Sequence, residues 1–112
     1  MSITLNSIAD QVHELACIKG WHSQSETEDH FIERTCNNLH DEISELHEAW
    51  RNNRLHDVCD KGTLTCLEEE LADIIIRVLD ASRKLHVDIQ HAVLTKHEIN
   101  KTRTTRHGGK RS

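Results

Sequence analysis

Proline and tyrosine are absent from this sequence of 112 residues, and glycine occurs only four times. Proline breaks a helix interior because it lacks a backbone N–H and clashes with the preceding turn, so nothing in this chain forces a helix to end. No segment alternates apolar and polar residues as a half-buried strand does. The sequence therefore predicts an all-α protein.

Long apolar runs are also missing. The most apolar run is Ile74-Ile75-Ile76, whereas a membrane-spanning helix needs about 20 apolar residues. Met1 to Ser7 lacks the basic region and apolar stretch that mark a secretory signal peptide. We therefore expect a cytoplasmic protein without a membrane partner. The length suits one domain with one core, residues 1–112.

The four cysteines form no Cys-x-x-Cys pair. Cys59 and Cys66 are spaced too widely for a zinc knuckle, and Cys17 and Cys36 fall in helical stretches. In a reducing compartment cysteines stay reduced. The sequence therefore predicts free thiols, with Cys17 and Cys36 as small core residues.

Four segments carry apolar residues at the three- and four-residue spacing of a helix face. Gly20 is a natural stop for the first. Ser-x-x-Glu from Ser25 and Thr-x-x-Glu from Thr65 are capping boxes that open the second and third, and Asp88 is an N-cap for the fourth. The predicted helices span about 4–19, 25–51, 65–84 and 88–102.

Two acidic pairs, Glu42-x-x-Glu45 and Glu70-x-x-Asp73, lie on the second and third predicted helices. At about 100° per residue, each pair sits on the same flank of its helix's apolar stripe, whereas Asp41 points to the solvent side. If the two helices pack together, the four carboxylates converge. The stripes that set this geometry are Ile32, Leu39, Ile43, Leu46 and Trp50 on one helix, and Leu67, Leu71, Ile74 and Val78 on the other.

Four converging carboxylates repel one another, and a hard cation removes that cost. A ligand set made only of oxygen atoms is typical of Mg²⁺ or Mn²⁺. The predicted metal ligands are therefore Glu42, Glu45, Glu70 and Asp73, with Asp80 as an extra candidate. A solvated acidic face is the alternative interpretation. A di-iron bundle needs Glu-x-x-His on two helices, and no glutamate in this chain has histidine three residues later.

The basic residues gather near the end of the chain. Six of the 14 Lys and Arg residues lie between positions 96 and 112, beside a single acid, which suits a polyphosphate ligand. Lys96, Asn100 and Arg103 share one face of the fourth predicted helix. Residues 104–112 are predicted to form a basic tail in which Lys110 follows Gly108-Gly109.

With these residues the chain resembles the MazG-type family of all-α nucleoside triphosphate pyrophosphohydrolases, which is related to the dimeric dUTPases. The similarity covers about residues 18–111 and is carried by "HDEISELHEAW", "LEEELADIIIRVLD" and "KHEINKTRTTRHGGKR". It implies a four-helix bundle, Mg²⁺ on the four acids, and hydrolysis of a nucleoside triphosphate to monophosphate and pyrophosphate. It also implies a homo-oligomer, dimer or tetramer, with sites near subunit interfaces.

Roles for the remaining candidates follow from their types and positions. Glu45 is our preferred general base. Trp21, in a polar loop, is the candidate for stacking on a base, and Arg77 either contacts phosphate or pairs with Asp73. The basic face Lys96, Asn100 and Arg103, together with Lys110, matches the family's phosphate-binding residues.

Two further expectations concern partners. Ile74, Ile75 and Ile76 span about 200° of a helix, so Ile76 is expected to face outward, and a second subunit is the simplest cover. The alternative function is a non-enzymatic helical interaction or nucleic-acid-binding module that uses the basic C-terminal tail, whereas the pyrophosphohydrolase is not expected to have a nucleic-acid partner. That module has no need of acids clustered beside the core.

Overall fold

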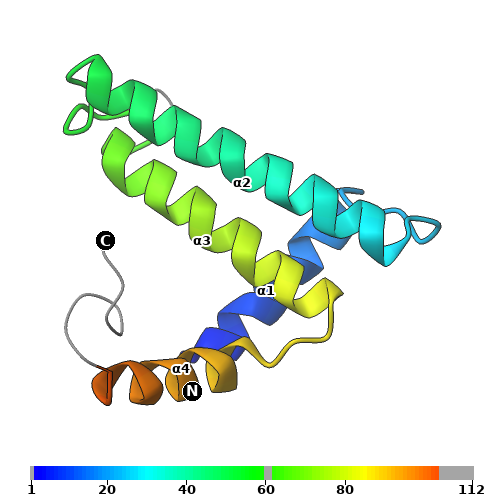
Figure 1. Ribbon diagram of the computed structural model, residues 1–112. Coiled ribbons are helices and arrows are strands. Elements are labelled where there is room, and N and C mark those ends of the chain that lie inside the picture. The colour runs from blue at the N-terminus through cyan, green and yellow to red at the C-terminus, as the bar shows by residue number, and fades with distance from the viewer. Residues whose placement is uncertain (1, 60–61, 104–112) are drawn as a thin grey trace.

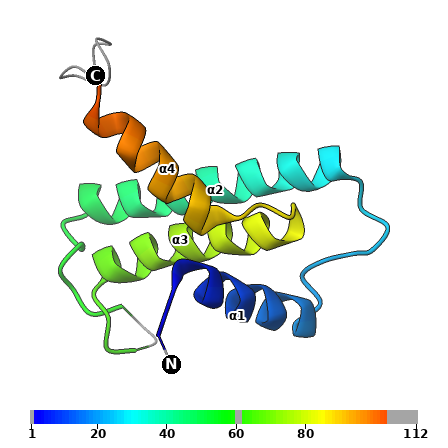
Figure 2. The same cartoon turned by 90° about the horizontal axis from the view of Figure 1, so that it is seen from below.

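The computed structural model describes residues 2–59 and 62–103, and this part of the chain is helical (Figures 1 and 2). Its helices are α1 (Leu5–Ile18), α2 (Glu28–Arg51), α3 (Cys66–Lys84) and α4 (Ile89–Lys101). Among the described residues the only β-type pairing is an isolated bridge between Val58 and Thr65. None of the described helices has the length and apolar character needed to cross a membrane. The all-α prediction is confirmed.

Most helix ends lie where local chemistry predicts them. Gly20 adopts a φ of +74°, and the N–H groups of Gly20 and Trp21 bond back to the last turn of α1, as in a Schellman motif. Thr65 and Asp88 accept hydrogen bonds from backbone N–H groups as N-caps of α3 and α4. The box predicted at Ser25 was wrong, because Thr27 is the N-cap of α2 and accepts from the His30 N–H.

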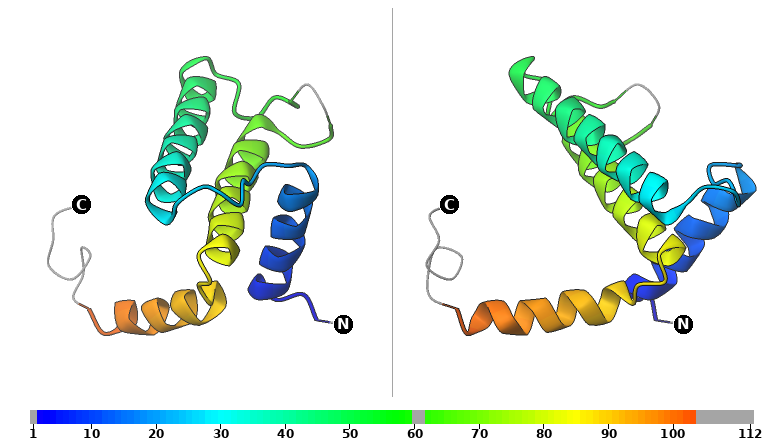
Figure 3. Two further views of the ribbon diagram at one scale, coloured as in Figure 1. Left: turned by 90° about the vertical axis from the view of Figure 1, so that its right-hand side faces the viewer. Right: turned by 45° about the vertical axis from the view of Figure 1, so that its right-hand side comes forward.

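The helices α2 and α3 run antiparallel and side by side, and α1 packs against α3 (Figures 1 and 3). The fourth helix leaves this layer and touches mainly the start of α1 (Figure 3). Asn6 holds it there, because its side chain accepts from the Gln90 N–H at 3.1 Å while its own N–H donates to Gln90 Oε1 at 3.2 Å. Within one chain, therefore, three helices pack closely and α4 stands apart.

The apolar stripe of α2 faces the interior of the chain only in part, because Leu39 and Leu46 are half-buried and its other residues are exposed. Ile43 and Trp50 are 52% and 60% exposed, whereas Phe31 and Glu42 are the buried residues of this helix. On α3, Leu71 and Val78 of the predicted apolar stripe are 46% and 38% exposed, and Ile75 beside them is 54% exposed, whereas Ile76 lines a cavity beside Glu42. The face of α2 that packs against α3 is therefore centred nearer to the acidic residues than to the predicted apolar stripe.

Cys59 and Cys66 form a disulfide, with their Cα atoms 5.0 Å apart. Local backbone bonds bring them together, because the Cys66 N–H donates to the Asp57 carbonyl and the Cys59 N–H donates to the Leu64 carbonyl. The prediction of four free thiols was therefore wrong for this pair. Cys17 and Cys36 are free, but both are exposed and are not core residues.

Candidate functional site

Glutamates from two helices converge where α2 packs against α3. Glu42 and Glu45 lie one turn apart on α2, Glu70 lies on α3, and their carboxylates each offer an oxygen within 4.8 Å of the others. Glu42 is only 7% exposed. Asp73 does not join this group of three, but it lies close enough to raise the pKa of Glu42 and lines a cavity with it.

These carboxylates destabilise one another's charged forms. Burial and the neighbouring Glu45 raise the pKa of Glu70 to about 7. Burial, and then the charges of Glu45 and Asp73, raise the pKa of Glu42. Arg77 Nη2 donates to Glu42 Oε1 at 3.4 Å, which offsets part of this effect.

The second oxygen of Glu42 has no donor. Glu42 Oε2 is buried and lacks a hydrogen-bond partner among the described residues. A buried polar atom left unpaired costs roughly 1–3 kcal/mol, and a cation would satisfy it. An all-oxygen donor set is what Mg²⁺ or Mn²⁺ prefers. The residues therefore fit a hard divalent cation.

The acidic cluster lies between two cavities. One, of about 240 Å³, contains Glu45 and Glu70 together with the Cys59–Cys66 disulfide. The other, of about 130 Å³, is lined by Trp21, Glu42, Asp73, Ile76, Arg77 and Asp80. Trp21 is half exposed and so is free to contact a ligand in the second cavity. The predicted base-stacking residue Trp21 thus shares a cavity with Glu42 and Asp73, whereas Glu45 and Glu70 line the other one.

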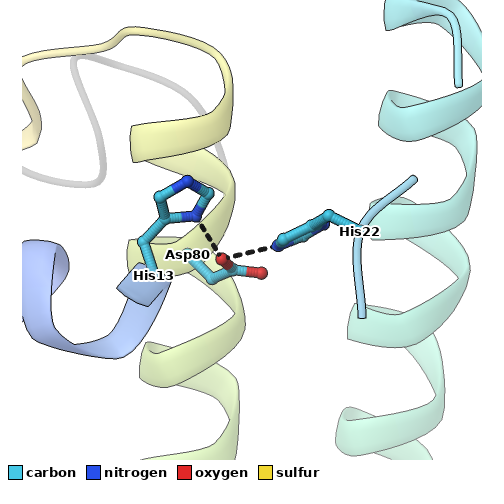
Figure 4. Close-up of side chains that lie close together, drawn as sticks. All are labelled: His13, His22 and Asp80. Atoms are coloured by element: carbon cyan, nitrogen blue, oxygen red, sulfur yellow. Dashed lines mark hydrogen bonds and ion pairs between the residues drawn. The ribbon is translucent and has the colours of Figure 1, made fainter. Parts of the chain in front are cut away.

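A second polar cluster is formed by His13, His22 and Asp80 (Figure 4). His13 Nδ1 and His22 Nε2 each lie 2.8 Å from the same oxygen, Asp80 Oδ1. Arg34 Nη2 is 3.5 Å from His22 Nδ1 and binds Glu26 Oε1 at 2.8 Å. Asp80, considered from the sequence as an extra metal ligand, instead accepts two histidine bonds.

The two clusters differ in how their polar atoms are paired within the described residues. If each histidine donates to Asp80 Oδ1, Arg34 can donate to the remaining nitrogen of His22, so both ring nitrogens of His22 have protein partners. A metal bound to His22 Nε2 would leave the ring proton on His22 Nδ1. That N–H would then face the N–H donor of Arg34, and two donors cannot form a hydrogen bond with one another. The glutamate cluster has no such internal solution, since Glu42 Oε2 lacks a donor.

The other predicted site residues lie elsewhere. Arg77 pairs with Glu42; a pairing with Asp73, one of its predicted roles, is not found among the described ion pairs. Lys96 and Asn100 line a shallow depression formed by α4 residues alone, and Arg103 follows the end of α4. Nothing in the described structure joins these three residues to the acids of the same chain. Lys110 lies outside the described residues.

Sequence reasoning missed His13 and His22. They are nine positions apart, on α1 and in the following loop, and match no metal or catalytic pattern. Only the packing of α1 against α3 brings them to Asp80. The one local signal was the position of His22 beside Trp21, just after the stop at Gly20.

None of the protein-family models, curated proteins or solved structures compared with the chain matches it. A functional assignment therefore depends on the residues and geometry described above.

Proposed function

We propose that this protein hydrolyses nucleoside triphosphates between the α- and β-phosphates, releasing a nucleoside monophosphate and pyrophosphate, with Mg²⁺ or Mn²⁺ as cofactor. The observation that supports this most directly is the convergence of Glu42, Glu45 and Glu70 around a buried oxygen without a donor. Such a group is costly in the free protein and favourable once a cation is present. The motif resemblance adds the reaction type.

The metal would be held by Glu42, Glu45, Glu70 and Asp73. When bound, it would neutralise phosphate charge and orient the attacking water. Glu45 is our candidate general base, because it is exposed and can exchange its proton with solvent. Glu70 offers a carboxylate oxygen within 4.8 Å of a Glu45 oxygen, so a second acid stands beside the candidate base.

The cavity beside the acids suits the rest of the substrate. Trp21 supplies an aromatic face for a base, and Arg77 is 40% exposed at its side chain, so its guanidinium can reach a phosphate. The predicted phosphate residues on α4 do not meet the acids within one chain. We infer that a second copy brings Lys96, Asn100 and Arg103 to the site or holds α4 against it.

The direct test is Mg²⁺-dependent release of pyrophosphate from a mixture of the common deoxynucleoside triphosphates. We expect pyrophosphate and monophosphate in equal amounts, no inorganic phosphate, and complete loss in EDTA. Release of inorganic phosphate alone would indicate cleavage at the γ-phosphate and contradict the proposed bond. No release with either metal would favour the helical interaction module, whose partner would then be sought through the basic segment.

A further inference from the structure

The cavity lined by Trp21 and Asp80 has two chemically different ends. Glu42 and Asp73 belong to the acidic cluster, where phosphate and cation chemistry is expected under the proposed function. Asp80 lies two turns further along α3 than Asp73, and its side-chain partners among the described residues are the two histidines. An indole face and one carboxylate are therefore available to a group beyond the phosphates.

Asp80 is held in a fixed orientation. Both histidines bond to Oδ1, and Figure 4 shows the second oxygen, Oδ2, without a dashed line and turned away from His13. No hydrogen bond to Oδ2 occurs among the described residues. His22 is only 7% exposed at its side chain and packs between His13 and Phe31, with ring centroids 5.3 Å and 5.5 Å away.

We propose that Asp80 is a specificity residue whose free oxygen accepts a hydrogen bond from an exocyclic amino group on the nucleobase stacked against Trp21. His13 and His22 are positioning residues, because they fix which carboxylate oxygen is free. This proposal rests on the proposed function for its substrate class. It adds a preference that the acidic cluster cannot provide.

The preference follows from the chemistry of the acceptor. An ionised carboxylate oxygen can only accept, so it binds the amino group of cytosine or adenine and repels the carbonyl oxygen at the same position of uracil or hypoxanthine. A site built to hydrogen-bond a substrate group rejects an analogue that lacks it, because the protein group is left unpaired. The closest substrate pairs are therefore dCTP with dUTP and dATP with dITP.

The experiment compares kcat/KM within these two pairs. In whichever pair gives the higher kcat/KM, we expect the nucleotide with the amino group, dCTP or dATP, to be favoured at least tenfold over its partner with the carbonyl oxygen. Asp80→Asn keeps an oxygen for the histidines but replaces the free oxygen with an NH₂ donor, so it should reduce that ratio at least tenfold. His22→Ala should reduce the ratio as well, and His40→Ala, an exposed position on α2, should not.

Equal use of both members, or a preference for the oxo member, in the wild-type protein would overturn the proposal. So would an unchanged ratio in a folded Asp80→Asn variant, with folding checked by circular dichroism. If that variant does not fold, the wild-type ratio still decides.

A binding measurement separates this proposal from the hydrolase proposal. The chain has two tryptophans, so Trp50→Phe leaves Trp21 as the only one. Quenching of its fluorescence by dCMP at lower concentration than by dUMP supports the specificity role even if no triphosphate is cleaved. If pyrophosphate is released but neither the kcat/KM ratio nor monophosphate binding favours the amino-bearing base, the hydrolase proposal stands and the proposed role of Asp80 is rejected.

Discussion

At the scale of single residues, Glu42 carries the strongest constraint in the molecule. Its pKa is raised by burial and by neighbouring acids, and one of its oxygens has no donor. A residue chosen for stability alone would be glutamine or an apolar side chain here, because both avoid burying a charge. The cation proposed above would account for a carboxylate at this position.

Neutral amides at the acid positions test this directly. We expect Glu42→Gln, Glu45→Gln, Glu70→Gln and Asp73→Asn each to lower pyrophosphate release at least about a hundredfold, the scale of losing a positioned catalytic group. Folding should survive, because removing mutual repulsion costs little. Asp41→Asn is the control, since Asp41 is exposed beside the cluster, and Glu69→Gln is a second. Similar losses in the controls would contradict the assignment of the site.

The raised pKa of Glu70 predicts how stability depends on pH. Between its ordinary value of 4.5 and its folded value of about 7, the folded state holds a proton that the unfolded state has released, so this group makes stability fall as pH rises through that range. In EDTA, we expect a higher melting temperature at pH 5.5 than at pH 8.

Two controls accompany this measurement. Glu70→Gln should flatten the slope, and Mg²⁺ should reduce it, because bound cation replaces the proton. Glu26 acts in the opposite sense, since its hydrogen bond to Arg34 lowers its pKa to about 2, and its contribution is lost only below pH 4.5. A melting temperature in EDTA that rises steadily from pH 5.5 to 8 would show that the acids are not coupled as described.

At the scale of elements, the sequence predicted helix ends better than helix faces. Gly20, Thr65 and Asp88 act within a few residues of their own backbone, so local pattern suffices. The inward face of α2 depends on which surface α3 presents, and apolar content alone pointed to Ile43 and Trp50 rather than to Glu42. The flank position of the acids was predictable, but their burial and the His13–Asp80–His22 contacts required the packed chain.

The disulfide is an element-scale feature with a measurable contribution. It closes a loop with a sequence separation of 7, for which the chain-entropy relation gives about 2.4 kcal/mol of stabilisation. We expect reduction with dithiothreitol, or the Cys59→Ser variant, to lower the free energy of unfolding in urea by about this amount. Cys17→Ser, at an exposed free thiol, should change little, and a loss of stability on reducing the Cys59→Ser variant would show that another pairing exists.

At the scale of the whole molecule, one chain exposes more surface than a compact protein of its size. The exposed area is 8784 Å², whereas roughly 6300 Å² is expected for a folded monomer of this mass. On both α2 and α3, the apolar stripe is displaced from the acids in the same rotational direction around the helix axis. Because the two helices are antiparallel and their acids face one another, the two stripes lie on the same side of the helix pair. Ile43, Trp50, Leu71, Ile75 and Val78, which lie on or beside these stripes, are each more than one-third exposed, and we expect them to form an apolar face.

A second copy of the chain is the partner that this face and α4 suit best, because a symmetric dimer covers the same patch on both subunits. At about 10 µM, light scattering should give at least twice the 12.9 kDa of one chain. Ile75→Glu is the sharpest disruption, since it places a charge in the apolar face without a partner and, unlike Ile76, does not line the cavity beside the acids. Ile18→Glu is the control, because Ile18 is a 72% exposed isoleucine on α1. A wild-type mass near that of one chain would refute the oligomer, whereas a dimer that Ile75→Glu dissociates, with loss of pyrophosphate release, would show that activity requires the second subunit.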